Sequence, residues 1–118
     1  MLSIEKLKEF GANTEEGLSR CMGMEPFYLK LVRMSVEDPS FSRLENAMAA
    51  EDYSEAFEAC HALKGMLGNL GLDPLADTAS ELTEMLRPRQ KCDCAELVEK
   101  LFAGLKDLKS IIEEPAAE

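Results

Sequence analysis

The sequence lacks the residues from which a β-rich or aromatic core is built. It contains no tryptophan, and aromatic residues make up only 6% of its 118 positions. Valine, isoleucine and threonine are scarce, whereas leucine, alanine, glutamate, lysine and methionine dominate. No stretch alternates apolar and polar residues as a half-buried strand does. The composition therefore predicts helices throughout, packed around a core of leucine, methionine, alanine, isoleucine and a few phenylalanines.

Positive charge is also in short supply. The chain carries 13 basic and 23 acidic residues, which gives a formal net charge of −10 and an isoelectric point of about 4.6. A surface this negative repels the phosphates of nucleic acids and of anionic lipids. We therefore expect neither a nucleic acid nor a membrane as a partner.

Long hydrophobic runs are missing as well. No segment reaches the roughly 18 uninterrupted apolar residues of a membrane span, and residues 1–6 do not form the apolar part of a signal peptide. We expect a cytoplasmic protein whose four cysteines are reduced. The close pair, Cys92 and Cys94, has one intervening residue, which is not the spacing of a zinc knuckle or a redox motif. We expect no metal and no cofactor.

Helix start and stop signals divide the whole chain. Capping residues, prolines and glycines predict helices over residues 2–11, 13–23, 26–50 with a bend at Pro39, 53–70, 74–87 and 94–112. Because the connections are short, sequential helices should pack antiparallel. We expect one domain, 1–118: an all-α, antiparallel up-down four-helix bundle (26–112), with short accessory helices (1–23) over one end. The methionines are expected to fill its core, namely Met22, Met24, Met34, Met48, Met66 and Met85.

The predicted helix 53–70 breaks a local rule. On a helical wheel its apolar residues share one half, and His61, the only histidine, points away from them to solvent. Gly65 and Gly68 follow His61 by one and two turns on nearly the same face. Each interior glycine costs about 1 kcal/mol relative to alanine, so we interpret the pair as clearing space for another molecule. Two alternatives stay open: Gly68 could allow close helix packing, and Gly71 could serve only as a helix C-cap.

Lys64 adds a charge beside this histidine. Three residues after His61, it is a surface neighbour on the same helix. A neutral imidazole is a nucleophile, and a phosphoryl group carries close to two negative charges near neutral pH. A lysine suits such a group as a mobile point charge.

The run from His61 to Gly71, HALKGMLGNLG, resembles the signature of histidine-containing phosphotransfer (HPt) domains. These domains carry His-x-Leu-Lys-Gly, with a further glycine at the end of the same helix. The flanking segments 56–60 and 72–86 also look like the family. Met66 and Leu67 stand where the family often has small residues. Both fall on the buried side of the wheel, so we interpret them as core variation.

The resemblance implies a histidine phosphocarrier in a two-component phosphorelay. His61 would accept a phosphoryl group from a receiver-domain aspartate and pass it to another, Lys64 would stabilise its charge, and Gly65 would give the partner steric access. The implied partners are response-regulator receiver domains and a (hybrid) sensor histidine kinase, with Mg²⁺ and most catalytic groups on the partner. The carrier itself would be no enzyme and have no ATP site, and the chain contains no GxxxxGK[ST] loop. The expected partner-binding residues are Ala62, Gly68 and Asn69.

Two other classes of function compete with this one. A pseudo-HPt adaptor would bind receiver or kinase domains without phosphotransfer, but the intact His61 and Lys64 argue against it. A helical enzyme or metal protein has little support from one histidine and no Glu-x-x-His pair. The roles of Glu58, which could orient the imidazole, and of Asn69 stay open. We expect a monomer, because four long helices can close a bundle alone, and the start at Met1 favours a free-standing carrier.

Overall fold

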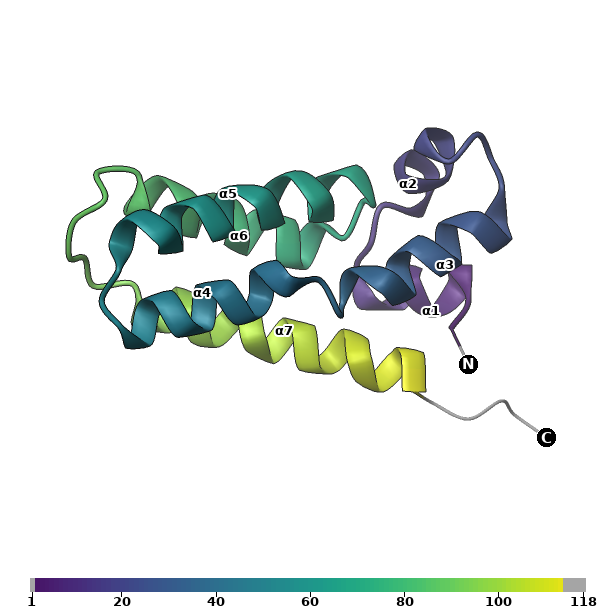
Figure 1. Ribbon diagram of the computed structural model, residues 1–118. Helices are drawn as coiled ribbons and strands as arrows, with labels where there is room; N and C mark the ends of the chain where they lie inside the picture. The colour runs from purple at the N-terminus through teal and green to yellow at the C-terminus, as the bar shows by residue number, and fades with distance from the viewer. Residues whose placement is uncertain (1, 114–118) are drawn as a thin grey trace.

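The computed structural model describes residues 2–113, which form seven helices and no strand (Figure 1). The predicted all-helical class is confirmed. The first residue and the last five residues of the expected domain 1–118 lie outside the described range. None of the helices in this range has the length and apolar character needed to cross a membrane. The helices are α1 (Ile4–Phe10), α2 (Thr14–Arg20), α3 (Glu25–Ser35), α4 (Pro39–Ala49), α5 (Tyr53–Asn69), α6 (Asp73–Leu86) and α7 (Ala95–Glu113).

Helix α5 lies at the centre of the packing. It packs along α4 and along α6, and α6 packs along α7. Phe41 of α4 meets Phe102 of α7 edge to face, with 6.2 Å between the ring centroids. The core between these four helices is built mainly from leucine, as the composition predicts. Its fully buried leucines include Leu44, Leu63, Leu67, Leu82, Leu86, Leu101 and Leu108.

The expected bent helix over 26–50 is instead two separate helices. Residues 36–38 leave the helical path between α3 and α4, because the ring of Pro39 excludes a helical conformation for the residue before it. Asp38 is accordingly extended, at φ −62° and ψ 132°, and its carboxylate accepts a hydrogen bond of 2.8 Å from the amide of Ser40. Asp38 therefore caps α4. The most extensive packing between helices is among α4, α5, α6 and α7.

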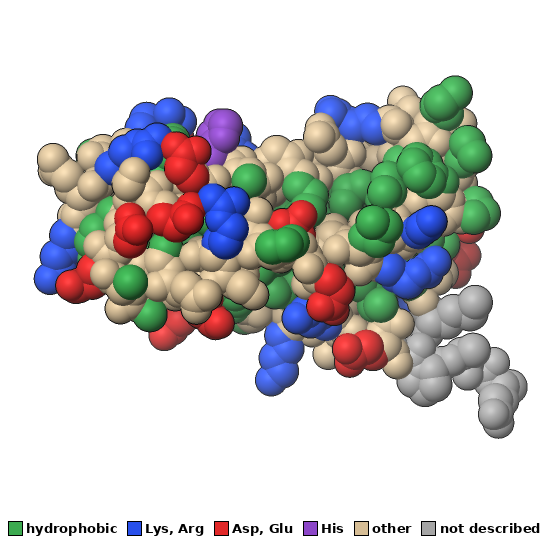
Figure 2. All heavy atoms as spheres, viewed as in Figure 1, with side chains coloured by type: hydrophobic (Ala, Val, Ile, Leu, Met, Phe, Trp, Pro, Cys, Tyr) green, Lys and Arg blue, Asp and Glu red, His purple; other side chains and the backbone are tan. Residues whose placement is uncertain are grey.

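The expectation that the methionines fill the core is wrong for most of them. Met48 and Met66 are partly buried against it, but the others are exposed. Met22 and Met24 lie in the connection between α2 and α3, at one end of the molecule, and Met34 lies near the C-terminal end of α3. Figure 2 shows apolar side chains gathered over this end. The exposed methionines are Met22, Met24, Met34 and Met85.

The N-terminal helices are fastened to the end of α5. The hydroxyl of Tyr28 on α3 is buried and donates a hydrogen bond of 2.7 Å to the carbonyl of Leu70. Burial, followed by the charges of Cys21 and Asp73, raises the pKa of Tyr28 to about 12, so the hydroxyl keeps its proton. The amide of Asn13 donates to the carbonyl of Gly71 at 2.7 Å. These bonds hold α2 beside the C-terminal end of α5.

Gly71 ends α5 in the conformation that a glycine C-cap requires. Its φ is +68°, a left-handed value that residues with a Cβ rarely adopt. The amide of Leu72 bonds to the carbonyl of Leu67 at 3.0 Å, and the amide of Gly71 bonds to that of Gly68 at 3.1 Å. This pair of bonds is the Schellman motif. The interpretation of Gly71 as a C-cap therefore agrees with the structure. Its carbonyl also accepts the hydrogen bond from the amide of Asn13.

Candidate functional site around His61

His61 lies on the exposed face of α5, as the wheel predicts. Asp52 caps the helix by accepting a hydrogen bond of 3.1 Å from the amide of Glu55. The apolar half of α5 packs between α4 and α6, so the opposite half of the helix faces solvent. Met66 is only partly buried. The other apolar positions are buried as expected: Ala56, Phe57, Ala59, Cys60, Leu63, Leu67 and Leu70.

An open hollow of about 410 Å³ surrounds His61. Helix α5 contributes five of the predicted site residues to its lining, and α2 contributes Glu16 and Arg20. Ala62 is exposed, but it does not line the hollow. The α5 residues that come together are His61, Lys64, Gly65, Gly68 and Asn69.

The two glycines of this hollow are not required by the packing of the protein. A Cβ built at Gly65 or at Gly68 has no neighbouring atom within 4 Å. At Gly17, in contrast, a Cβ would lie 2.5 Å from the ring of Tyr28 and 2.7 Å from the carbonyl oxygen of Leu70. The alternative that Gly68 serves close helix packing is therefore wrong. The fold tolerates side chains at Gly65 and Gly68, but both positions are bare.

Arg20 is a site residue that the sequence did not reveal. Its guanidinium donates a hydrogen bond of 2.8 Å to the side-chain carbonyl of Asn69 and pairs with Glu16 at 2.5 Å. Arg20 and Asn69 are 49 positions apart, so no local pattern could join them. The contact gives Asn69 a partner within the protein and places a second cation, Arg20, at the hollow.

Phe57 is buried as expected, but its contact with the histidine ring was not predicted. The wheel places it in the core, and it is 8% exposed, but its ring stacks on that of His61. The ring centroids are 5.8 Å apart, with 28° between the planes. Their spacing of four residues makes them neighbours on a helix surface, which is a signal that the sequence does contain.

Two arginines from the end of α6 and the loop after it complete this surface. The guanidinium carbons of Arg87 and Arg89 lie 5.4 Å and 4.6 Å from the centroid of the Phe57 ring. Arg89 also pairs with Glu58 at 2.5 Å and donates to the hydroxyl of Ser54 at 2.6 Å. Glu58 is therefore engaged by Arg89, and no hydrogen bond joins it to His61.

Cations and carboxylates alternate around the histidine, because Arg20, Arg87 and Arg89 pair with Glu16, Glu84 and Glu58. Arg87, through its hydrogen bond, lowers the pKa of the Glu84 carboxyl, and the nearby charge of Lys64 lowers it further. Figure 2 shows lysine and arginine side chains on the surface beside the histidine. Lys64 and Arg20 are the cations that line the hollow itself, together with the carboxylate of Glu16.

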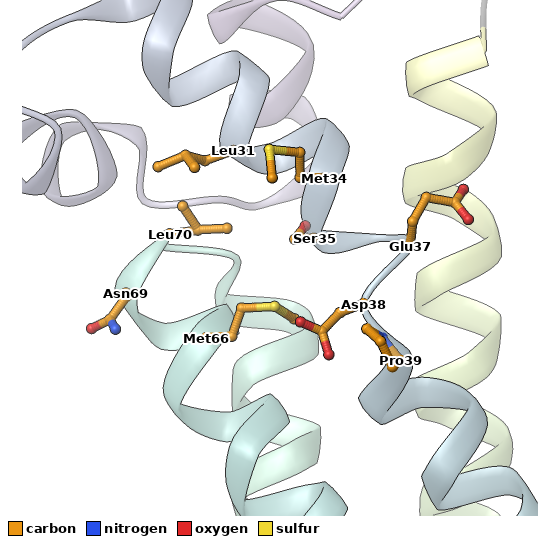
Figure 3. A pocket seen from close by; sticks show the side chains of 9 residues that line it. All are labelled: Leu31, Met34, Ser35, Glu37, Asp38, Pro39, Met66, Asn69 and Leu70. Atoms are coloured by element: carbon orange, nitrogen blue, oxygen red, sulfur yellow. The ribbon is translucent and has the colours of Figure 1, made fainter.

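A second, larger hollow of about 580 Å³ adjoins the first (Figure 3). It lies between α3, the start of α4 and the C-terminal end of α5, and Asn69 lines both hollows. The side chains of Leu31, Met34, Met66 and Leu70 line it with apolar surface, while Glu37 and Asp38 stand at one side. Of the exposed methionines, Met34 therefore lines a hollow that shares Asn69 with the one around His61.

The cysteines offer no nucleophile to this site. Burial raises the pKa of Cys60, next to His61 in the chain, and burial with hydrogen bonding to Cys92 raises the pKa of Cys94 to about 12. Both thiols therefore keep their protons at neutral pH. Among residues 2–113, no three histidine, cysteine or acidic side chains gather as a metal site would need.

The sequence of the chain matches the model of a known protein family. Residues 33–114, more than half of the chain, match the family model of the Hpt domain. The matched range contains α4 to α7 and every α5 residue of the hollow, whereas Arg20 and Glu16 lie outside it. Neither a curated protein nor a solved structure matches the chain.

The open glycines predict opposite effects of alanine at two positions. Gly68→Ala should raise the free energy of unfolding by up to about 1 kcal/mol, because alanine favours the helix and meets no neighbour. Gly71→Ala should lower it by at least about 1 kcal/mol, because φ is positive there and the new Cβ would fall onto the carbonyl of Asn13. Urea unfolding followed by circular dichroism measures both. If Gly68→Ala destabilised the protein as Gly71→Ala does, the fold itself would need that glycine.

Proposed function

The chain belongs to the Hpt domain family, and from that premise we propose that His61 is the phosphoryl acceptor of a two-component phosphorelay. Hpt domains are phosphocarriers, not enzymes with an ATP site, and they act in signal transduction together with receiver domains and histidine kinases. The observation that carries the assignment is the pair of bare glycines beside the one exposed histidine. A fold that has room for side chains there but lacks them is suited to the close approach of a second protein.

In the proposed step, a nitrogen lone pair of neutral His61 attacks the phosphorus of an aspartyl phosphate on a receiver domain. The nitrogen–phosphorus bond forms as the phosphorus–oxygen bond breaks, and the aspartate leaves as a carboxylate. Transfer to a second receiver reverses these events. Such reactions depend on positioning and charge stabilisation more than on covalent chemistry by the protein. Magnesium and most catalytic groups come from the receiver.

Lys64 and Arg20 supply the charge stabilisation on this side of the complex. Both line the hollow that contains His61, and a phosphoryl group carries close to two negative charges. Gly65 gives the receiver steric access to the imidazole. Lys64 reaches the phosphoryl group as a mobile point charge, while Arg20 is held in place by Asn69.

The receiver covers more than the hollow itself. A stable interface buries about 800 Å² on each partner, so a domain docked at His61 extends onto neighbouring surface. Ala62, Gly68 and Asn69 contact it first, and the apolar hollow continues from Asn69. Towards Ser54 the surface is charged and already paired through Arg89. We therefore expect the larger part of the receiver interface to lie on the apolar side.

The remaining expectations fit the same proposal. The chain forms a single domain with an antiparallel up-down four-helix bundle over 26–112, in which α3 and α4 together make the first member, and the helices of 1–23 are accessory to it. The protein acts as a cytoplasmic monomer with receivers and a (hybrid) sensor histidine kinase as partners. The competing function is a pseudo-HPt adaptor, which would bind the same receivers without accepting phosphate. The presence of His61, Lys64 and open space at Gly65 favours the carrier.

Removal of the imidazole tests the acceptor directly. His61→Gln should abolish labelling by a phosphorylated receiver, and the wild-type label should be labile to acid and stable to base, as a phosphoramidate is. Because an exposed side chain contributes little to folding, the melting temperature should stay nearly unchanged. Intact-protein mass after incubation with the receiver measures the label. A label that survives His61→Gln would show that the acceptor is another residue, and a wild type that binds receiver but takes no label would identify an adaptor.

The charge of Lys64 should matter after transfer more than before it. Lys64→Ala should shorten the lifetime of phosphorylated His61 more than it weakens binding of the unphosphorylated protein, and Lys100→Ala, on exposed surface of α7, should do neither. Added salt should change wild-type affinity little, because the acidic chain is not drawn to an acid-rich receiver site by net charge. Titration of receiver at low and high salt, with decay of the label, measures both. A steep loss of affinity with salt would mean that opposite charges drive docking.

A further inference from the structure

The imidazole of His61 is not held by a hydrogen bond to another side chain of residues 2–113. The contact recorded for its ring is with Phe57, one turn earlier on α5, at 5.8 Å between centroids and 28° between planes. Offset stacking at this distance is a favourable arrangement of aromatic rings. The stacking partner is itself well fixed, because the Phe57 side chain is only 8% exposed.

Phe57 is also braced from a second element. The guanidinium of Arg89 lies 4.6 Å from the centroid of the Phe57 ring, within the range of a cation–π contact. Arg89 cannot swing freely, since one end of its guanidinium donates to Ser54 and another pairs with Glu58. Its backbone has a positive φ of 58°, which is uncommon for a residue with a side chain. The loop after α6 thus turns Arg89 back over α5.

We propose that Phe57 is a positioning residue for His61: its ring, braced by Arg89, holds the exposed imidazole in one orientation beside the hollow. The inference rests on the proposed function of His61. An exposed side chain otherwise samples several rotamers, and a nucleophile that is misplaced by about 1 Å loses much of its rate. Phe57 touches neither the phosphoryl group nor the receiver in this account. It acts through the orientation of His61.

Removal of the ring at constant apolar character tests this role. Phe57→Leu should shift the NMR signals of the His61 ring protons in the free, unphosphorylated protein, because the ring current of Phe57 is lost. The rate of phosphoryl transfer at saturating receiver should fall roughly two- to tenfold, as the loss of one aromatic stack implies. Receiver affinity should stay within about twofold, since the binding surface is unchanged. Phe57→Tyr keeps the ring and should retain the wild-type rate.

Two further variants keep the test decisive. Phe102→Leu removes an aromatic ring on α7 whose ring partner is Phe41, and it should alter neither the His61 signals nor the rate. Arg89→Gln changes an exposed side chain and should show part of the effect expected of Phe57→Leu. It serves as the test variant if Phe57→Leu fails to fold. If Phe57→Leu left the His61 signals and the transfer rate unaltered, the positioning role alone would be overturned. The same holds for Arg89→Gln where that variant replaces Phe57→Leu in the test. An equal loss of affinity and rate would identify Phe57 as a contact instead. A wild type without label overturns the proposed function as well.

Discussion

The burial of one face of α5 between α4 and α6 is the constraint on which the site depends. Leucine, alanine and phenylalanine side chains commit that half of the helix to the core, and the helical repeat then fixes which residues face outward. His61 is exposed for this reason and not because of any contact of its own. The same constraint places Lys64, Gly65 and Gly68 beside it. A shift of α5 by one residue that put His61 in the place of the buried Cys60 would bury the imidazole.

The end of α5 is the second place where fold and site meet. The chain turns at Gly71. The carbonyl of Gly71 accepts a hydrogen bond from the amide of Asn13, and the carbonyl of Leu70 accepts one from the hydroxyl of Tyr28. Because α2 is fastened there, Arg20 reaches Asn69. A segment outside the range that matches the family model thus adds a cation to the hollow. It also adds Leu31 to the apolar surface of the adjoining hollow.

The sequence predicted what depends on neighbours along the chain. The caps at Asn13 and Asp52, the glycine at the end of α5 and the exposure of His61 follow from local hydrogen bonding and the helical repeat, and the structure agrees with them. The pairing of Arg20 with Asn69 and of Arg89 with Glu58 could not be predicted, because each joins residues more than 30 positions apart. The methionines were assigned to the core by composition. That rule fails for the methionines in the connection between α2 and α3, for Met34 on α3 and for Met85 on α6.

The central claim is that Gly65 keeps the approach to His61 open. At this position a side chain would increase the stability of the helix but hinder the approach of the receiver. A side chain there has room within the protein and would favour the helix, yet it would stand beside His61 where the receiver must approach. The most direct measurement is the rate of phosphoryl transfer from a receiver to Gly65→Gln, with Gly65→Ala as the small control and the free energy of unfolding measured for both. The account predicts that Gly65→Gln folds at least as stably as the wild type and accepts phosphoryl groups about tenfold more slowly or worse. A stable Gly65→Gln that transfers at the wild-type rate would contradict it.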